Sequence, residues 1–149
     1  MEGINQLKNG NLISLSEQEP VDCNVDNNGC GGGSMDTAFF NLSNKTIASQ
    51  QKALLQAVPN QPISIAIEVS GSNFKFYSSG VFIGNCGTNF DHVVTVIGYG
   101  ATSDGTKYWL VKNSWGSRWG ENGYMKIKRD VTANEGLCGI AMQACYPIV

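Results

Sequence analysis

Four short segments in the second half of the chain alternate apolar and polar residues, and this period of two limits the fold more than any other feature. They are ISIAIEV at 63–69, HVVTVIGYG at 92–100, KYWLVKN at 107–113 and GYMKIKR at 123–129. Such alternation is typical of β-strands that bury one face. Before residue 59 the pattern is helical, at 1–9, 16–23, 34–43 and 49–58. The sequence therefore predicts an α+β protein that divides into a helical part, 1–46, and a strand-rich part, 47–149.

Composition excludes several classes of partner. Hydrophobic residues make up 42% of the chain and charged residues only 15%, as expected for a globular protein. The net charge of −2 gives no electrostatic reason to bind nucleic acid or an anionic membrane. KIKR at 126–129 alternates with apolar residues and is better explained as the solvated face of a strand. No apolar run approaches the roughly 20 residues of a membrane span. We expect neither nucleic acid nor a membrane as partner.

His92 is the only histidine, and three roles are open to it. It could be a buried structural group, a metal ligand or a catalytic base. A metal site is disfavoured, because no second histidine exists and Cys23 and Cys30 lie seven positions apart. We expect no metal and no other cofactor.

A partner for His92 follows from treating 92–100 and 107–113 as one hairpin. With the turn centred between Thr102 and Ser103, a simple antiparallel register places Asn113 opposite His92. Facing side chains on one face have Cβ atoms about 4.5–5.5 Å apart, close enough for the asparagine oxygen to accept from the imidazole. A histidine oriented by an asparagine is the base half of a nucleophile–base–orienter arrangement. At this point a buried structural histidine remains the simpler interpretation.

The residues after Asn113 favour a catalytic base over a buried structural histidine. Trp115 comes two positions after Asn113, where its indole can cover the His–Asn hydrogen bond and exclude water. The stretches DHVVTVIGYG, YWLVKNSWGSRWGENGYM and GLCGIAMQACYP resemble the papain-family cysteine proteases, especially those of plants. EGINQLKNGNLISLSEQEPVDC and NNGCGGGSMDTAFF resemble the helical lobe of the same family. The motifs occur in family order over nearly the whole chain.

The resemblance implies a papain-like two-lobe fold with a β-barrel-like antiparallel second lobe and an incomplete helical lobe. It implies peptide-bond hydrolysis by a thiol protease through a covalent acyl-enzyme. His92 then corresponds to the catalytic base, Asn113 to its orienter and Trp115 to the shielding indole. Expected partners are peptide or protein substrates and, as inhibitors, propeptides and cystatin-like proteins.

The resemblance also assigns substrate-binding positions. Gly32 and Gly33 match the backbone that pairs with an extended substrate, where absent side chains allow close approach. Four residues match the walls of the pocket for the substrate's second side chain. They are Ala66, Asp91, Val93 and Gln143. Since Gln143 is polar in a pocket that is often apolar, no preferred substrate residue is assigned.

Two family segments have no counterpart in the sequence. The nucleophile motif CGSCW and the preceding oxyanion-hole glutamine are absent, since MEGI resembles the far end of the helix that carries the nucleophile. Between FFNLSNKT and IASQQKALL the family has several dozen further residues. We therefore expect the chain as written to be inactive by itself. A non-catalytic pseudoprotease that binds peptides or inhibitors, or a degenerate product that does not fold, are the alternatives.

The five cysteines fit this interpretation. The resemblance pairs Cys86 with Cys138 in a disulfide and pairs Cys30 and Cys23 with cysteines in the missing segments. Cys145 stands where the family often has serine. The thiols of Cys23, Cys30 and Cys145 do not occupy the nucleophile position. In the family that position lies at a helix N-terminus, which stabilises a thiolate.

The family is lysosomal, vacuolar or extracellular, which makes the sequons at Asn41 and Asn44 candidate glycosylation sites. MEGINQLKNG lacks the features of a signal peptide. Translated as written, the chain is expected in the cytosol.

Overall fold

The computed structural model describes residues 2–16, 18–24, 26–40, 44–47 and 50–147. The chain forms two compact units, Met1–Thr46 with Cys145–Val149, and Ile47–Ala144. The sequence had suggested a second part covering 47–149, whereas the last five residues group with the first unit. The fold is of the mixed α+β class.

The first unit is mainly helical. It contains α1 (Glu2–Asn9), α2 (Gln18–Cys23), the 3-10 turn η1 (Gly29–Gly31) and α3 (Met35–Phe40). It also contains β1 (Asn44–Thr46), which pairs antiparallel with β7 (Ala144–Pro147) and aligns Thr46 with Cys145. Each of the helices predicted at 1–9, 16–23 and 34–43 is therefore present within the described residues, but the β1–β7 pair was not predicted.

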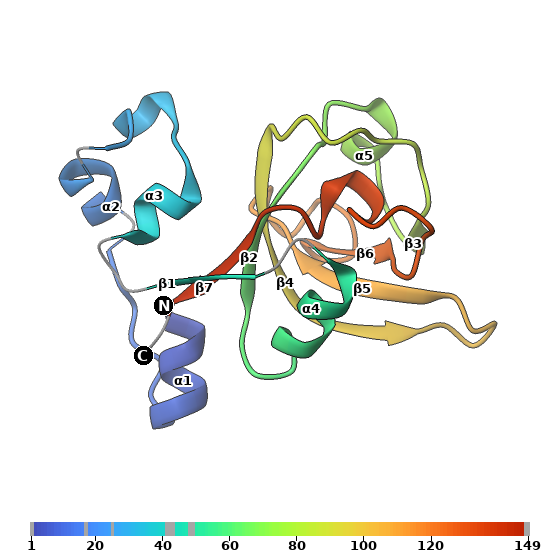
Figure 1. The fold of residues 1–149 in the computed structure, drawn as a ribbon, viewed down its shortest axis with the longest axis horizontal. Helices are drawn as coiled ribbons and strands as arrows, with labels where there is room; N and C mark the ends of the chain where they lie inside the picture. Colours follow the sequence, from blue (N-terminus) through green and yellow to red (C-terminus); the bar gives the residue numbers. More distant parts are fainter. Residues whose placement is uncertain (1, 17, 25, 41–43, 48–49, 148–149) are drawn as a thin grey trace. The chain divides into compact units, whose positions relative to one another are not determined.

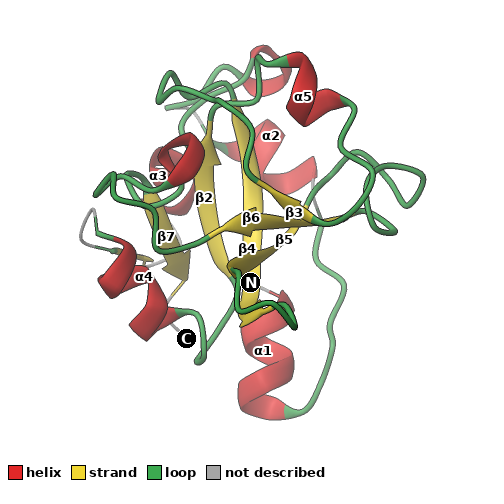
Figure 2. Ribbon diagram, turned by 90° about the vertical axis from the view of Figure 1, so that its right-hand side faces the viewer, coloured by secondary structure: helices red, strands yellow, loops and turns green. Residues whose placement is uncertain are grey.

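The second unit is built on a sheet in the order β2-β4-β5-β6-β3, seen as the strands of Figures 1 and 2. Its strands are β2 (Ile63–Ile67), β3 (Val81–Phe82), β4 (His92–Ala101), β5 (Lys107–Lys112) and β6 (Tyr124–Lys128). The two-residue pairing of β3 with β6 is parallel, and the other pairs are antiparallel. Three short helical segments accompany the sheet: α4 (Gln51–Ala57), α5 (Ser72–Lys75) and the 3-10 turn η2 (Leu137–Gly139).

The core of this unit follows from the alternation. Ile65 pairs with Val94, and Val96 with both Ile63 and Val111. These residues are almost completely buried. The next pairs along the sheet, Val111 with Met125 and Trp109 with Ile127, continue the same apolar face. A row of β-branched residues across neighbouring strands packs well on a pleated surface, so the sheet and the core form together.

The disulfide Cys86–Cys138 joins the loop before β4 to the 3-10 turn η2 within the second unit, across 52 positions. It is the pair that the family resemblance implies. In the chain-entropy account, closing a loop of this length stabilises the folded state by about 4 kcal/mol. Cys86 lies in the loop that leads to His92, so the bond restrains this loop.

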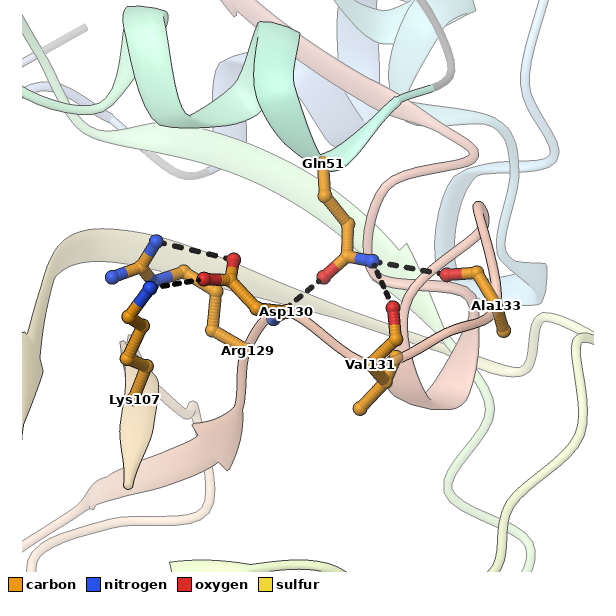
Figure 3. A network of polar contacts seen from close by, with 6 residues as sticks. All are labelled: Gln51, Lys107, Arg129, Asp130, Val131 and Ala133. Atoms are coloured by element: carbon orange, nitrogen blue, oxygen red, sulfur yellow. Dashed lines mark hydrogen bonds and ion pairs between the residues drawn. The ribbon is translucent and has the colours of Figure 1, made fainter. Parts of the chain in front are cut away.

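Gln51, the first residue of α4, fastens this helix to the segment that follows β6 (Figure 3). Its side-chain Nε2 donates to the carbonyls of Val131 at 3.1 Å and Ala133 at 2.9 Å. Its Oε1 accepts from the backbone N–H of Asp130 at 3.1 Å. The Asp130 carboxylate pairs with Lys107 at 2.9 Å, and this contact is the main cause that lowers the pKa of Asp130.

Truncation of a core isoleucine tests the assigned face of β2. We expect Ile65→Ala to lower the free energy of unfolding by about 2–5 kcal/mol, because Ile65 is fully buried and its loss leaves a cavity. The matched control is Ile97→Ala, whose side chain is 38% exposed and whose loss should cost below about 1 kcal/mol. Urea unfolding followed by tryptophan fluorescence measures both. Equal costs would show that the face is assigned wrongly.

Replacing Gln51 with glutamate tests the α4 anchor. A carboxylate cannot donate to the carbonyls of Val131 and Ala133, so Gln51→Glu should cost about 1–2 kcal/mol, although a negative charge at a helix start is otherwise favourable. The carbonyls raise the pKa of the new carboxyl, so the deficit should shrink as the pH falls through that pKa. Gln56→Glu, at an exposed position of the same helix, is the control. A deficit that does not change with pH would contradict the assigned contacts.

Candidate active site

His92 is the first residue of β4, and its side chain is partly exposed at the end of the core. Its backbone pairs with Ile67, the last residue of β2. Its Nε2 lies 2.8 Å from Oδ1 of Asn113. Asn113 follows β5 directly and is only 6% exposed. The sequence thus named two residues that the structure brings into hydrogen-bond contact.

A second contact of Asn113 fixes the tautomer of the imidazole. The backbone N–H of Ser114 donates to the same Oδ1 at 2.7 Å, so this atom acts as an acceptor. Since Oδ1 can only accept, Nε2 of His92 must carry the hydrogen. The neutral ring then has its lone pair on Nδ1. His92 is therefore held in the form in which Nδ1 can take a proton from a neighbouring acid.

The register from which the pair was predicted is wrong. Asn113 is not opposite His92 in the ladder, since β5 ends at Lys112 and the ladder joins Val96 to Val111. Two features shift the strands. The turn spans residues 102–106 and is centred on Asp104, not between Thr102 and Ser103, with Gly105 at φ +85°, and a bulge separates Val96 from Gly98. Bulges and turn lengths are not visible in apolar periodicity.

Trp115 lies beside the imidazole, with ring centroids 5.0 Å apart. The indole is 39% exposed, so it covers one side of the His–Asn pair and remains open to solvent on the other. Behind it, Phe74 of α5 contacts Trp115 edge-on at 5.7 Å and stacks on Trp119 at 5.5 Å. Trp119 Nε1 donates to the carbonyl of Lys75. This aromatic group fixes Trp115 in place.

Phe74 and Trp119 were not proposed as site residues from the sequence. The repeat of Trp-Gly in SWGSRWG was the available signal for Trp119. Phe74 had no such signal, because the four-residue helix that presents it has no periodicity of its own.

The predicted pocket residues lie on and next to β2 and β4. Ala66 pairs with Val93, which is 45% exposed. The N–H of Ala66 donates to the carbonyl of Gln143 at 3.0 Å. Asp91 instead uses its carboxylate locally, because Oδ1 accepts from the N–H of Val69 at 2.7 Å. The second unit thus holds these four positions together, and their role towards substrate stays a prediction.

Gly32 and Gly33 belong to the first unit. Gly32 has φ +95°, a conformation that favours glycine, and its carbonyl accepts from Asn28. The side chain of Asn27 packs closely over Gly33 while it bonds both the N–H and the carbonyl of Ser34. These local contacts explain both glycines as parts of a tight turn. Their predicted contact with substrate backbone is not tested by them.

The remaining thiols and sequons are spread over the first unit. Cys23 and Cys30 are exposed, and Cys145 is buried. Asn44 begins β1, whereas Asn41 lies outside the described residues. Across the part of the chain that the structure describes, no group of three metal-ligating side chains forms. No helix in that part is long and apolar enough to cross a membrane.

Comparison with known proteins decides the family. Residues 1–53 and 42–148 match the sequence profile described as papain family cysteine protease. The chain belongs to the papain family. Among curated relatives, thiol protease SEN102 from Hemerocallis sp. is 50% identical over 99% of this chain and 51% of its own length. Vignain from Ricinus communis is 47% identical, again over 99% of this chain and 51% of its own length.

Solved structures show the same fold. Bromelain from Ananas comosus, in complex with the inhibitor E64, superposes with a TM-score of 0.93 at 37% identity, over 99% of this chain and 84% of that chain. The proform of the ragweed pollen cysteine protease Amb a 11 gives 0.94 at 37% identity, over 99% and 56%. The chain spans about half the length of the curated relatives. The alignment with SEN102 covers 183 positions, more than the 149 residues present, so that relative carries segments that this chain lacks.

Removing the orienter tests the tautomer assignment. In Asn113→Ala the imidazole loses the acceptor on Nε2, so we expect a single Nε2–H tautomer to become a mixture of both. The chain has one histidine, so long-range ¹H–¹⁵N spectra report it without overlap. Asn73→Ala, at an exposed position of α5, serves as the control and should leave the spectrum unchanged. An unchanged tautomer in Asn113→Ala would contradict the assignment.

Proposed function

We propose that this chain carries the base half of a papain-type thiol protease site, with His92 as base, Asn113 as orienter and Trp115 as cover. The observation that carries the proposal is the hydrogen bond between His92 Nε2 and Asn113 Oδ1, which leaves Nδ1 to accept a proton. The family relationship supplies the reaction class, peptide-bond hydrolysis.

In that reaction class the histidine transfers a proton from the thiol to the leaving amine, and then a proton from water to the departing thiolate. It takes the proton of a cysteine thiol, and the thiolate attacks the carbonyl carbon of the peptide bond. The imidazolium then gives the proton to the leaving amine as the C–N bond breaks, leaving an acyl thioester. Water hydrolyses the thioester with the same imidazole as base. Nδ1 of His92 is suited to each of these transfers.

The nucleophile is the part that these 149 residues do not supply. Cys86 and Cys138 are joined in a disulfide, Cys145 is buried, and Cys23 and Cys30 belong to the first unit. Loss of the nucleophile costs on the order of 10⁶-fold in kcat in a serine protease. We therefore expect that the chain alone does not turn over substrate.

A non-catalytic peptide-binding role is the second candidate. It is favoured by the pocket positions on β2 and β4, where Ala66 and Val93 are paired and Val93 is exposed beside His92. Peptides, propeptides and cystatin-like inhibitors are the partners that this surface would take. Among the solved relatives, one is bound to the inhibitor E64 and one is in its proform.

A fluorogenic peptide amide tests the first proposal. We expect the purified chain to release no fluorophore above the rate of its His92→Ala variant, while an active papain-family enzyme under the same reducing conditions does. Isothermal titration with an uncleaved peptide then tests binding. Hydrolysis that disappears in His92→Ala would show that one of the present thiols serves as nucleophile and would overturn the proposed inactivity. Absence of binding would remove the second candidate.

A further inference from the structure

The last residue of β2 and the two residues after it bond two of the three residues that precede His92. The carbonyl of Ile67 accepts from the N–H of Asp91 at 3.2 Å. The carboxylate of Glu68 accepts from the N–H of Asn89 at 2.7 Å. The N–H of Val69 donates to Asp91 Oδ1 at 2.7 Å. Of these contacts, only that of Glu68 reaches beyond Asp91 into the loop before it.

Glu68 is well suited to hold this loop. Its Oε1 accepts from the hydroxyl of Ser70 at 2.8 Å, and its carboxylate packs against Gly87. Its own N–H donates to the carbonyl of Cys138, so it is tied to the disulfide as well. The Asn89 amide is the main cause that lowers the pKa of Glu68, followed by the Ser70 hydroxyl. The carboxylate is thus ionised at neutral and mildly acidic pH, where an anionic acceptor makes the stronger bond.

The position of the imidazole depends on this loop because His92 directly follows it. Residues 83–91 contain no helix or strand, and His92 is the first residue of β4. Strand ends open more readily than strand centres, because they lack paired backbone on one side. The disulfide restrains the loop at Cys86, but six positions separate that residue from His92. Glu68 holds the intervening stretch at Gly87 and Asn89.

We propose that Glu68 is a positioning residue for His92. By binding the Asn89 amide it keeps the first residues of β4 paired with β2, so that the imidazole stays hydrogen-bonded to Asn113. Glu68 is partly exposed to solvent and does not form part of the buried core. This inference deepens the proposed function, since it concerns the same histidine, but it is a statement about imidazole geometry that needs no turnover.

The test uses the full chain and its single histidine. Hydrogen exchange of the imidazole Nε2–H, and of the Asn89 and Asp91 amides, is measured by NMR in Glu68→Ala and Glu68→Gln. We expect the imidazole proton to exchange at least about threefold faster in Glu68→Ala, as loss of one such bond implies. Glu68→Gln keeps one acceptor oxygen and should lie between. Ser70→Ala, which removes only a supporting contact, should have a smaller effect.

Two references separate positioning from general loss of structure. Glu135→Gln removes the same charge elsewhere in the second unit and should leave the imidazole unchanged. The amides of β5 should exchange as in the wild type in every variant, which shows that the sheet remains folded. If Glu68→Ala disturbs those amides, Glu68→Gln decides the question.

Two results would overturn the proposal. One is an imidazole proton that exchanges at the wild-type rate in both Glu68 variants. The other is faster exchange of the Asn89 amide alone, which would make Glu68 a loop fastener without effect on His92. Neither result depends on hydrolysis or peptide binding, so failure here is distinct from failure of the proposed function.

Discussion

The pairing of β2 with β4 is the interaction on which the candidate site depends. Burial of Ile63 and Ile65 opposite Val96 and Val94 fixes the register, because a slip of one residue would turn every side chain to the other face. His92 has the same parity as Val94 and Val96, so it stands at the end of the core-facing row. The hydrophobic effect thus decides where the imidazole emerges.

The same parity explains why a wrong register still named the right partner. Asn113 follows Trp109 and Val111 on the core-facing row of β5, and both are fully buried. Near the site the assumed pairing differs from the observed one by two residues. An error of two keeps each side chain on its face, whereas an error of one would not. Two polar side chains at the ends of adjacent buried rows therefore come within hydrogen-bond distance of each other.

The sequence could not predict contacts between segments that lack a periodic pattern of apolar residues. The four strands and most helices follow from the spacing of apolar residues, as Ile63, Ile65 and Ile67 illustrate. The bulge after Val96, the five-residue turn and the β1–β7 pair depend on tertiary packing, which overrides local pattern. The same holds for Phe74 behind Trp115 and for Glu68 on Asn89. The motif resemblance identified His92, Asn113 and Trp115, but it did not identify the residues that hold them in place.

The His92–Asn113 pair has a structural reason to exist apart from catalysis. Asn113 Oδ1 also accepts the Ser114 N–H, and the Asn113 N–H donates to the carbonyl of Gly123 where β5 ends. A buried asparagine with these bonds would be costly to replace by an apolar residue, since it would leave the Ser114 N–H without its acceptor. The pair therefore has a structural role that does not depend on a nucleophile. The pair leaves Nδ1 of His92 able to accept a proton. Turnover would also require a cysteine thiol close to Nδ1.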